Sequence, residues 1–163
     1  MKEVAPNLYI GTIHEGSRIL SHPEEWRLVN VAKTLHLNIH GWSTTGKYSK
    51  HPHYIIYEEP TYITVNWVDG DAHLFDYDHN GVNVVKQLLA FIQKNLQDDK
   101  KVLITCDQAQ SRSPSVALLY LAKVLHTIPD TSYDDARSEF VKIYPEYAPK
   151  GIADFLRAKW NEL

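Results

Sequence analysis

The sequence predicts an α/β fold, in which one sheet carries helices on both faces. Short runs rich in β-branched and aromatic residues, at residues 54–57 and 62–68, are typical of strands. Helical spacing then appears in the second half, in the apolar residues Val82, Val85, Leu88, Leu89, Ile92 and Leu96. Strands separated by helices favour a layered α/β sheet. A length of 163 residues suits a single domain, which we expect to span residues 1–163.

The first half of the chain has the pattern of short strands joined by turns. Besides the two runs above, strands are expected at residues 8–10 and 28–32. The stretch from His40 to His53 holds Gly, Ser, Thr and Pro, which are typical of an exposed loop. His51 and His53 in this loop lack further ligands at the usual spacing, so no metal site is predicted.

The second half contains one more strand and further helices. Residues 102–105 form a short, continuously apolar run, which predicts a central, buried strand. A helix is expected from Ser113 to about Leu125, with Pro114 at its first position, where a missing N–H costs nothing. Ser132 resembles a helix cap with Asp135 three residues later, and a last helix is expected over about 150–161.

Composition excludes several classes of partner. The formal net charge of −3 argues against nucleic acid or an anionic membrane. No apolar stretch approaches the roughly 20 residues that span a bilayer, and residues 1–11 carry no signal peptide pattern. The single cysteine, Cys106, cannot form an internal disulfide and fits a reducing compartment. We therefore expect a cytoplasmic protein, and a monomer that needs no cofactor.

The segment from Cys106 to Arg112 carries the chemical signal. A buried strand ends at Cys106, and a helix begins just after Arg112. A strand, a short loop and a helix N-terminus form an anion-binding geometry, because unpaired N–H groups point into the loop and the helix dipole favours negative charge. A cation just before a helix N-terminus opposes that dipole, so Arg112 is an odd choice for stability alone. The pattern therefore favours a functional loop over a buried, inert cysteine.

The chemistry of this loop suits phosphate monoesters. A helix N-terminus and a nearby cation favour the thiolate form of cysteine, which makes Cys106 a candidate nucleophile. Arg112 offers a planar fork for two phosphate oxygens. Ser113 could donate its hydroxyl to the Cys106 sulfur, or simply cap the helix. The backbone of the loop would hold the phosphate oxygens, through Asp107, Gln108, Ala109, Gln110, Ser111 and Arg112.

This segment resembles the active-site loop of the cysteine-dependent protein phosphatases, in particular the small dual-specificity phosphatases. Their pattern is His-Cys-x2-Gly-x2-Arg-Ser between an apolar strand and a helix. Residues 4–11, 28–32 and 62–69 also resemble the family's strands, so the likeness spans most of the chain. It implies a protein tyrosine phosphatase-like fold, with a central, mostly parallel mixed sheet. It further implies hydrolysis of phosphotyrosine or phosphoserine/threonine on proteins, or of a small phosphomonoester, through a Cys106 thiophosphate.

Two positions depart from the family pattern. Thr105 stands in place of the histidine that precedes the nucleophile, and Ala109 stands in place of glycine. If position 109 needs a positive φ, alanine costs on the order of 1 kcal/mol of strain there. Both departures put the rate of the reaction in question, and they leave open a phosphate-binding module without strong activity.

The resemblance also implies a general acid on a loop roughly 30 residues before the cysteine. Asp69 follows the apolar strand directly, as the acid of the family does, and Asp71 is the near alternative. Asp76 and Asp78 have the character of a polar approach to the next helix. A solvated acidic loop is the other interpretation of this cluster. Of two further classes, a rhodanese-like sulfur transfer domain is less favoured by the Arg112-Ser113 run, and a nucleotide-binding loop lacks its Gly-x4-Gly-Lys pattern.

Overall fold

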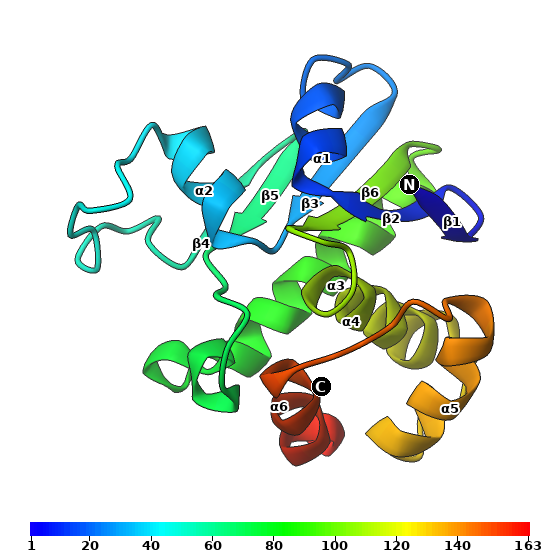
Figure 1. The fold of residues 1–163 in the computed structure, drawn as a ribbon. Helices are drawn as coiled ribbons and strands as arrows, with labels where there is room; N and C mark the ends of the chain where they lie inside the picture. The colour runs from blue at the N-terminus through cyan, green and yellow to red at the C-terminus, as the bar shows by residue number, and fades with distance from the viewer.

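One six-stranded mixed sheet forms the centre of the protein, and the computed structural model describes all 163 residues (Figure 1). Its order is β1-β2-β6-β3-β5-β4. The four inner strands are parallel, and the edge strands β1 and β4 are antiparallel to their neighbours. The predicted fold class, a single α/β domain with a mostly parallel mixed sheet, is confirmed. The strands are β1 (Lys2–Ala5), β2 (Leu8–Thr12), β3 (Trp26–Asn30), β4 (Ile56–Glu59), β5 (Tyr62–Val65) and β6 (Lys101–Cys106).

Strand β6 lies between β2 and β3, and its residues 102–106 are all buried. This is why the run is continuously apolar: a strand covered on both faces has no polar side to show. In the register of the sheet, Thr105 pairs with Asn30, and Cys106 pairs with Thr12. The carboxyl ends of parallel strands meet at one edge of a sheet, so Cys106 emerges where β3 and β5 also end.

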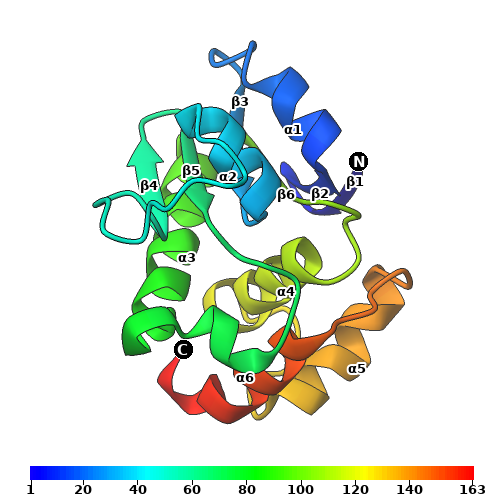
Figure 2. The ribbon, with the colours of Figure 1, turned by 60° about the vertical axis from the view of Figure 1, so that its left-hand side comes forward.

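Helices cover the two faces of the sheet unequally. Helices α1 and α2 pack on one face, and α3 to α6 pack on or beside the other, as the two ribbon views agree (Figure 2). The larger hydrophobic core lies on the second face and includes Leu88, Phe140 and Phe155, whereas Leu28, Leu35 and Leu103 belong to a small core under α1 and α2. The helices are α1 (Ile13–Ile19), α2 (Lys33–His40), α3 (Gly81–Gln97), α4 (Arg112–Leu119), α5 (Tyr133–Ile143) and α6 (Gly151–Lys159).

The sequence did not predict α1 and α2. Helix α1 has seven residues, which is too short for a helical period to show. In α2 the apolar residues Leu35, Leu37 and Ile39 alternate, which is the pattern of a strand. Packing of both helices on the sheet decides their conformation.

Several predicted boundaries shift. The strand expected over 62–68 ends at Val65, and the one over 28–32 is Trp26–Asn30. Helix α4 begins at Arg112, so Pro114 is its third residue, and the chain continues as a π-helical turn, Tyr120–Leu125. The Ser132 cap is confirmed: its Oγ accepts a hydrogen bond from Asp135 N at 3.1 Å. None of the helices combines the length and the apolar character that crossing a bilayer requires.

Candidate active site

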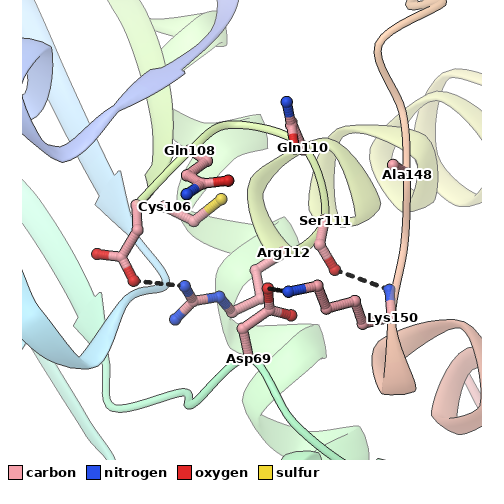
Figure 3. A pocket seen from close by; sticks show the side chains of 9 residues that line it. Asp69, Cys106, Gln108, Gln110, Ser111, Arg112, Ala148 and Lys150 are labelled. Carbon is pink, nitrogen blue, oxygen red and sulfur yellow. Dashed lines mark hydrogen bonds and ion pairs between the residues drawn. The ribbon is translucent and has the colours of Figure 1, made fainter.

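The loop of residues 107–111 joins the end of β6 to the start of α4, as the sequence predicts. Its N–H groups bond no carbonyl of the protein, so they are free donors at the N-terminus of a helix. A pocket of about 230 Å³ opens beside this loop. Its lining is mostly polar (Figure 3): Asp69, Cys106, Asp107, Gln108, Gln110, Ser111, Arg112, Ala148 and Lys150. A concave set of free amides of this kind binds anions.

Cys106 lies at the base of the site, only 2% exposed. Its Sγ lies 3.1 Å from the Oγ of Ser113, in the first turn of α4. Ser113 is fully buried, so its hydroxyl has no water to bond. The geometry agrees with the expected contact between Ser113 and the sulfur. The helix cap position is occupied by Ser111 instead.

Arg112 is buried beneath the pocket and is held at the end of its guanidinium. Its Nη1 donates to the carbonyl of Trp67 at 2.6 Å, and its Nη2 donates to Asp107 Oδ2 at 2.7 Å. Its Nε is buried and has no hydrogen-bond partner. A buried, unpaired donor is costly, typically about 1–3 kcal/mol, and so marks a site where a ligand would be stabilising.

The segment before α6 supports the loop from outside. Ala148 N donates to Gln110 O at 2.8 Å, and Lys150 N donates to Ser111 Oγ at 3.1 Å. Tyr144 Oη donates to Ala109 O at 2.7 Å. Burial, with a smaller contribution from Glu146, raises the pKa of Tyr144 to about 12, so this donor keeps its proton. Three carbonyl or hydroxyl groups of the loop are thereby fixed by one distant segment.

Ala109 adopts a left-handed conformation, with φ of 58°. This is the conformation that glycine adopts without cost, and the family has glycine at this position. The conditional expectation from the sequence is met: alanine here carries strain on the order of 1 kcal/mol. Ala109 is buried and does not line the pocket, so it contributes its backbone only.

Thr105 stands where the family has histidine, and it belongs to a buried polar chain. Its Oγ1 donates to Asn30 Oδ1 at 3.4 Å, and Asn30 Nδ2 donates to Thr64 Oγ1 at 2.9 Å. Thr64 Oγ1 in turn lies 3.0 Å from Nδ1 of His36, whose Nε2 lies 3.0 Å from the carbonyl of His53. Burial, together with His40 nearby, lowers the pKa of His36 to about 4, so His36 is neutral. Thr105 therefore bonds away from the sulfur.

The two candidate acids occupy different positions. Asp69 lines the pocket and is 24% exposed, and its Oδ2 lies 3.6 Å from Lys150 Nζ. Its Oδ1 is buried and unpartnered. Asp71 is exposed and lies outside the pocket, at the start of a 3₁₀ turn. Because Asp69 lines the pocket and Asp71 does not, the geometry favours Asp69. The backbone of Gly70 and Asp71 is packed against Gly151, where an added Cβ would lie 2.1 Å from Gly70 O.

Lys150 and Ala148 line the pocket although sequence reasoning did not identify them. Both follow Cys106 by more than 40 residues and carry no motif, so no local pattern could have indicated them. In Figure 3 the Lys150 side chain extends from the N-terminus of α6 toward Asp69. The aromatic side chains of Tyr54, Tyr57 and Tyr62 line no part of this pocket. No group of three or more His, Cys, Asp or Glu side chains is arranged to hold a metal ion.

The chain resembles one known protein family and several solved structures. A family model described as the Rit1 DUSP-like domain matches residues 80–144, which run from the start of α3 through the loop to α5. Among solved structures, human DUSP28 is 17% identical, with 98% of this chain and 91% of that chain covered and a TM-score of 0.62. The chain has the dual-specificity phosphatase fold. No curated protein sequence matches it.

Two further structures share the dual-specificity phosphatase fold with this chain. The human tyrosine phosphatase-like serine/threonine/tyrosine-interacting protein is 16% identical, with 99% and 96% of the two chains covered and a TM-score of 0.64. A mouse putative dual specificity phosphatase, in complex with zinc tungstate, is 19% identical, with 98% and 85% covered and a TM-score of 0.61. The resemblance noted in the sequence is therefore confirmed in the fold.

Proposed function

We propose that this protein hydrolyses phosphate monoesters, with Cys106 as the nucleophile. The observation that carries the proposal is the set of unsatisfied donors around one buried sulfur. The free amides of residues 107–111 and the unpaired Nε of Arg112 belong to the loop and the arginine that border the pocket lined by Cys106. Each of these donors would gain a partner from a bound phosphate, whose charge also suits the N-terminus of α4.

The first chemical step transfers the phosphoryl group to sulfur. The Cys106 thiolate attacks phosphorus, so an S–P bond forms while the bond from phosphorus to the ester oxygen breaks. The leaving oxygen takes a proton from the carboxylic acid of Asp69, which lines the same pocket. The loop amides and Arg112 stabilise the equatorial oxygens as charge shifts in the transition state. The products of this step are an alcohol or phenol and a thiophosphate on Cys106.

The second step hydrolyses the thiophosphate. Water attacks phosphorus and gives a proton to the Asp69 carboxylate, so an O–P bond forms and the S–P bond breaks. The electron pair returns to sulfur, which leaves as a thiolate. Ser113 Oγ, 3.1 Å from that sulfur, donates a hydrogen bond to the leaving thiolate. The reaction releases inorganic phosphate and restores the enzyme without a metal or cofactor.

The substrates we favour are phosphotyrosine, phosphoserine or phosphothreonine on proteins, or a small phosphomonoester. The pocket contains two cationic side chains, Arg112 and Lys150, and each already faces a carboxylate. Such a site suits one phosphate group better than a polyphosphate or a nucleic acid. We infer that the protein acts as a monomer in the cytoplasm, where a lone cysteine stays reduced.

A phosphate-binding module with little activity is the second candidate. Two observations favour it: the positive φ of Ala109, and the hydrogen bond that directs Thr105 toward Asn30. One protein with the same fold is called a tyrosine phosphatase-like, serine/threonine/tyrosine-interacting protein. In this alternative the loop holds a phosphorylated partner, and no chemistry follows.

A phosphopeptide panel with the wild-type protein and Cys106→Ser tests the proposed function. We expect release of phosphate from the wild type to fall to background in Cys106→Ser, because serine is a far weaker nucleophile in this setting. Binding of tungstate should survive in the variant, since the amides and Arg112 remain. Full activity in the serine variant would refute the assignment of the nucleophile.

Labelling of the thiol separates the two candidates. Iodoacetate reacts with thiolate, and a free cysteine reaches half of its maximal rate near pH 8.5. The enzyme candidate predicts that Cys106 is labelled faster than a free cysteine at neutral pH. Labelling that follows the free cysteine, together with no phosphate release from any peptide, would favour the binding module.

A further inference from the structure

An acidic residue, Asp107, lies inside the phosphate-binding loop and bonds the arginine of that same loop. Its Oδ2 accepts a hydrogen bond from Arg112 Nη2 at 2.7 Å. Asp107 follows Cys106 directly in the chain and lines the same pocket. A carboxylate at this place repels a phosphate dianion, and it also occupies one donor of the guanidinium. Asp107 therefore opposes phosphate binding in two ways.

The two partners of this ion pair differ in their freedom to move. The Arg112 side chain is 4% exposed, whereas the Asp107 side chain is 40% exposed. Arg112 is also fixed by the Trp67 carbonyl through Nη1, independently of Asp107. When an anion enters, the guanidinium therefore stays in place, and Asp107 is the group that can turn toward solvent.

The free side of the guanidinium shows where an oxyanion would bind. Nε is buried and has no hydrogen-bond partner. The N–H of Nε and one N–H of Nη2 point in the same direction along one side of the planar guanidinium. Bidentate binding of phosphate uses two such parallel N–H groups. A phosphate that binds Nε and Nη2 must therefore share Nη2 with Asp107 or displace it.

We propose that Asp107 is a specificity-determining residue that competes with the oxyanion for Arg112 and so weakens the binding of phosphate. The inference rests on the proposed function of the pocket. Competition of this kind keeps the released product from occupying the site and disfavours substrates that carry further negative charge beside the phosphate. A role limited to holding Arg112 in position makes the opposite prediction, because loss of the carboxylate would then weaken anion binding.

Titration of inorganic tungstate by calorimetry tests the proposal in the Cys106→Ser background, where no turnover interferes. Asp107→Asn removes the charge and keeps an acceptor for Nη2. We expect the Kd for tungstate to fall about three- to tenfold, the size expected for one charge in a partly solvated site. Asp98→Asn is the matched control, since Asp98 is exposed at the far end of α3, and its Kd should equal that of the parent.

Asp107→Ala is a second variant, which removes the charge without introducing an amide that could be oriented unfavourably. Thermal unfolding of each variant verifies that it is folded. The gain in affinity should shrink as salt is raised from 0.05 to about 1 M, because screening weakens a charge effect and not a positioning effect. An unchanged or higher Kd in both position-107 variants would overturn the competition and leave the proposed function standing. Absence of tungstate binding in every variant would overturn both.

Discussion

Two polar clusters lie at the carboxyl ends of neighbouring parallel strands, and they differ in how fully their polar groups are paired. The closed cluster, Asn30, His36, Thr64 and Thr105, is a continuous buried chain of hydrogen bonds. The open cluster, Asp69, Cys106, Asp107, Arg112 and Lys150, lines the pocket. Its buried Asp69 Oδ1 and Arg112 Nε have no partner.

This difference distinguishes polar groups that stabilise the fold from polar groups that are available to bind a ligand. A satisfied buried network fixes one arrangement of the sheet and gains nothing from a ligand. An unsatisfied one is costly on its own and becomes stabilised when a ligand of the right charge enters. Thr105 belongs to the first cluster and Cys106 to the second, although they are adjacent in the sequence, because successive residues of a strand point to opposite faces.

The largest effect is expected in the open cluster, on activity alone. Asp69→Asn should lower kcat/KM for a phosphopeptide by roughly 10²- to 10⁴-fold and should flatten the alkaline fall of the rate, since the leaving oxygen loses its acid. Stability should change little, because Asp69 forms only a long ion pair with Lys150. Asp71→Asn is the matched comparison and should keep the wild-type profile. If Asp71→Asn flattened the profile instead, the two aspartates would exchange roles.

A smaller effect is expected in the closed cluster, on stability and not on chemistry. The pKa of His36 is lowered from an ordinary value of 6.5 to about 4 by burial. Above pH 6.5 the neutral ring contributes its full stability. As the pH falls from 6.5 to 4, this histidine binds a proton in the unfolded chain more readily than in the folded chain. The free energy of unfolding therefore falls by about 3 kcal/mol.

Urea unfolding of wild type and His36→Gln between pH 4 and 7.5 measures this loss. The wild type should lose more stability than His36→Gln over this window, and most of the difference should be reached by pH 4. His14→Gln replaces an exposed histidine and should follow the wild type. Parallel curves for wild type and His36→Gln would show that the closed cluster accepts a proton on this ring.

The smallest effect concerns the strained backbone of the loop. Ala109→Gly should raise the free energy of unfolding by about 1 kcal/mol or less, because glycine adopts a φ of 58° without cost but loses more entropy on folding. Ala148→Gly, at a position without positive φ, should lower it instead. Equal losses from both changes would mean that Ala109 carries no strain.

Much of the fold was predictable because its signals are local. The apolar run 102–105, the helical spacing over residues 82–96 and the Ser132 cap each act within a few residues, and each is found as predicted in β6, α3 and α5. The loop geometry from Cys106 to Arg112 was predictable for the same reason. The short helices α1 and α2 were not, because packing against the sheet decides their conformation.

By itself the sequence determined the buried strand that ends at Cys106, the loop that joins it to the next helix and the position of the unusual Thr105 and Ala109, since these follow from order along the chain. Tertiary structure alone decided which aspartate reaches the pocket, that Lys150 joins it, and that Asp107 bonds Arg112. These depend on distances between segments many residues apart, or on how a side chain turns within a fold, and neither has a signature in local sequence. The buried Arg112 Nε, free of any partner, exists only once α4 is packed beneath β6 and the Trp67 carbonyl holds the other end of the guanidinium.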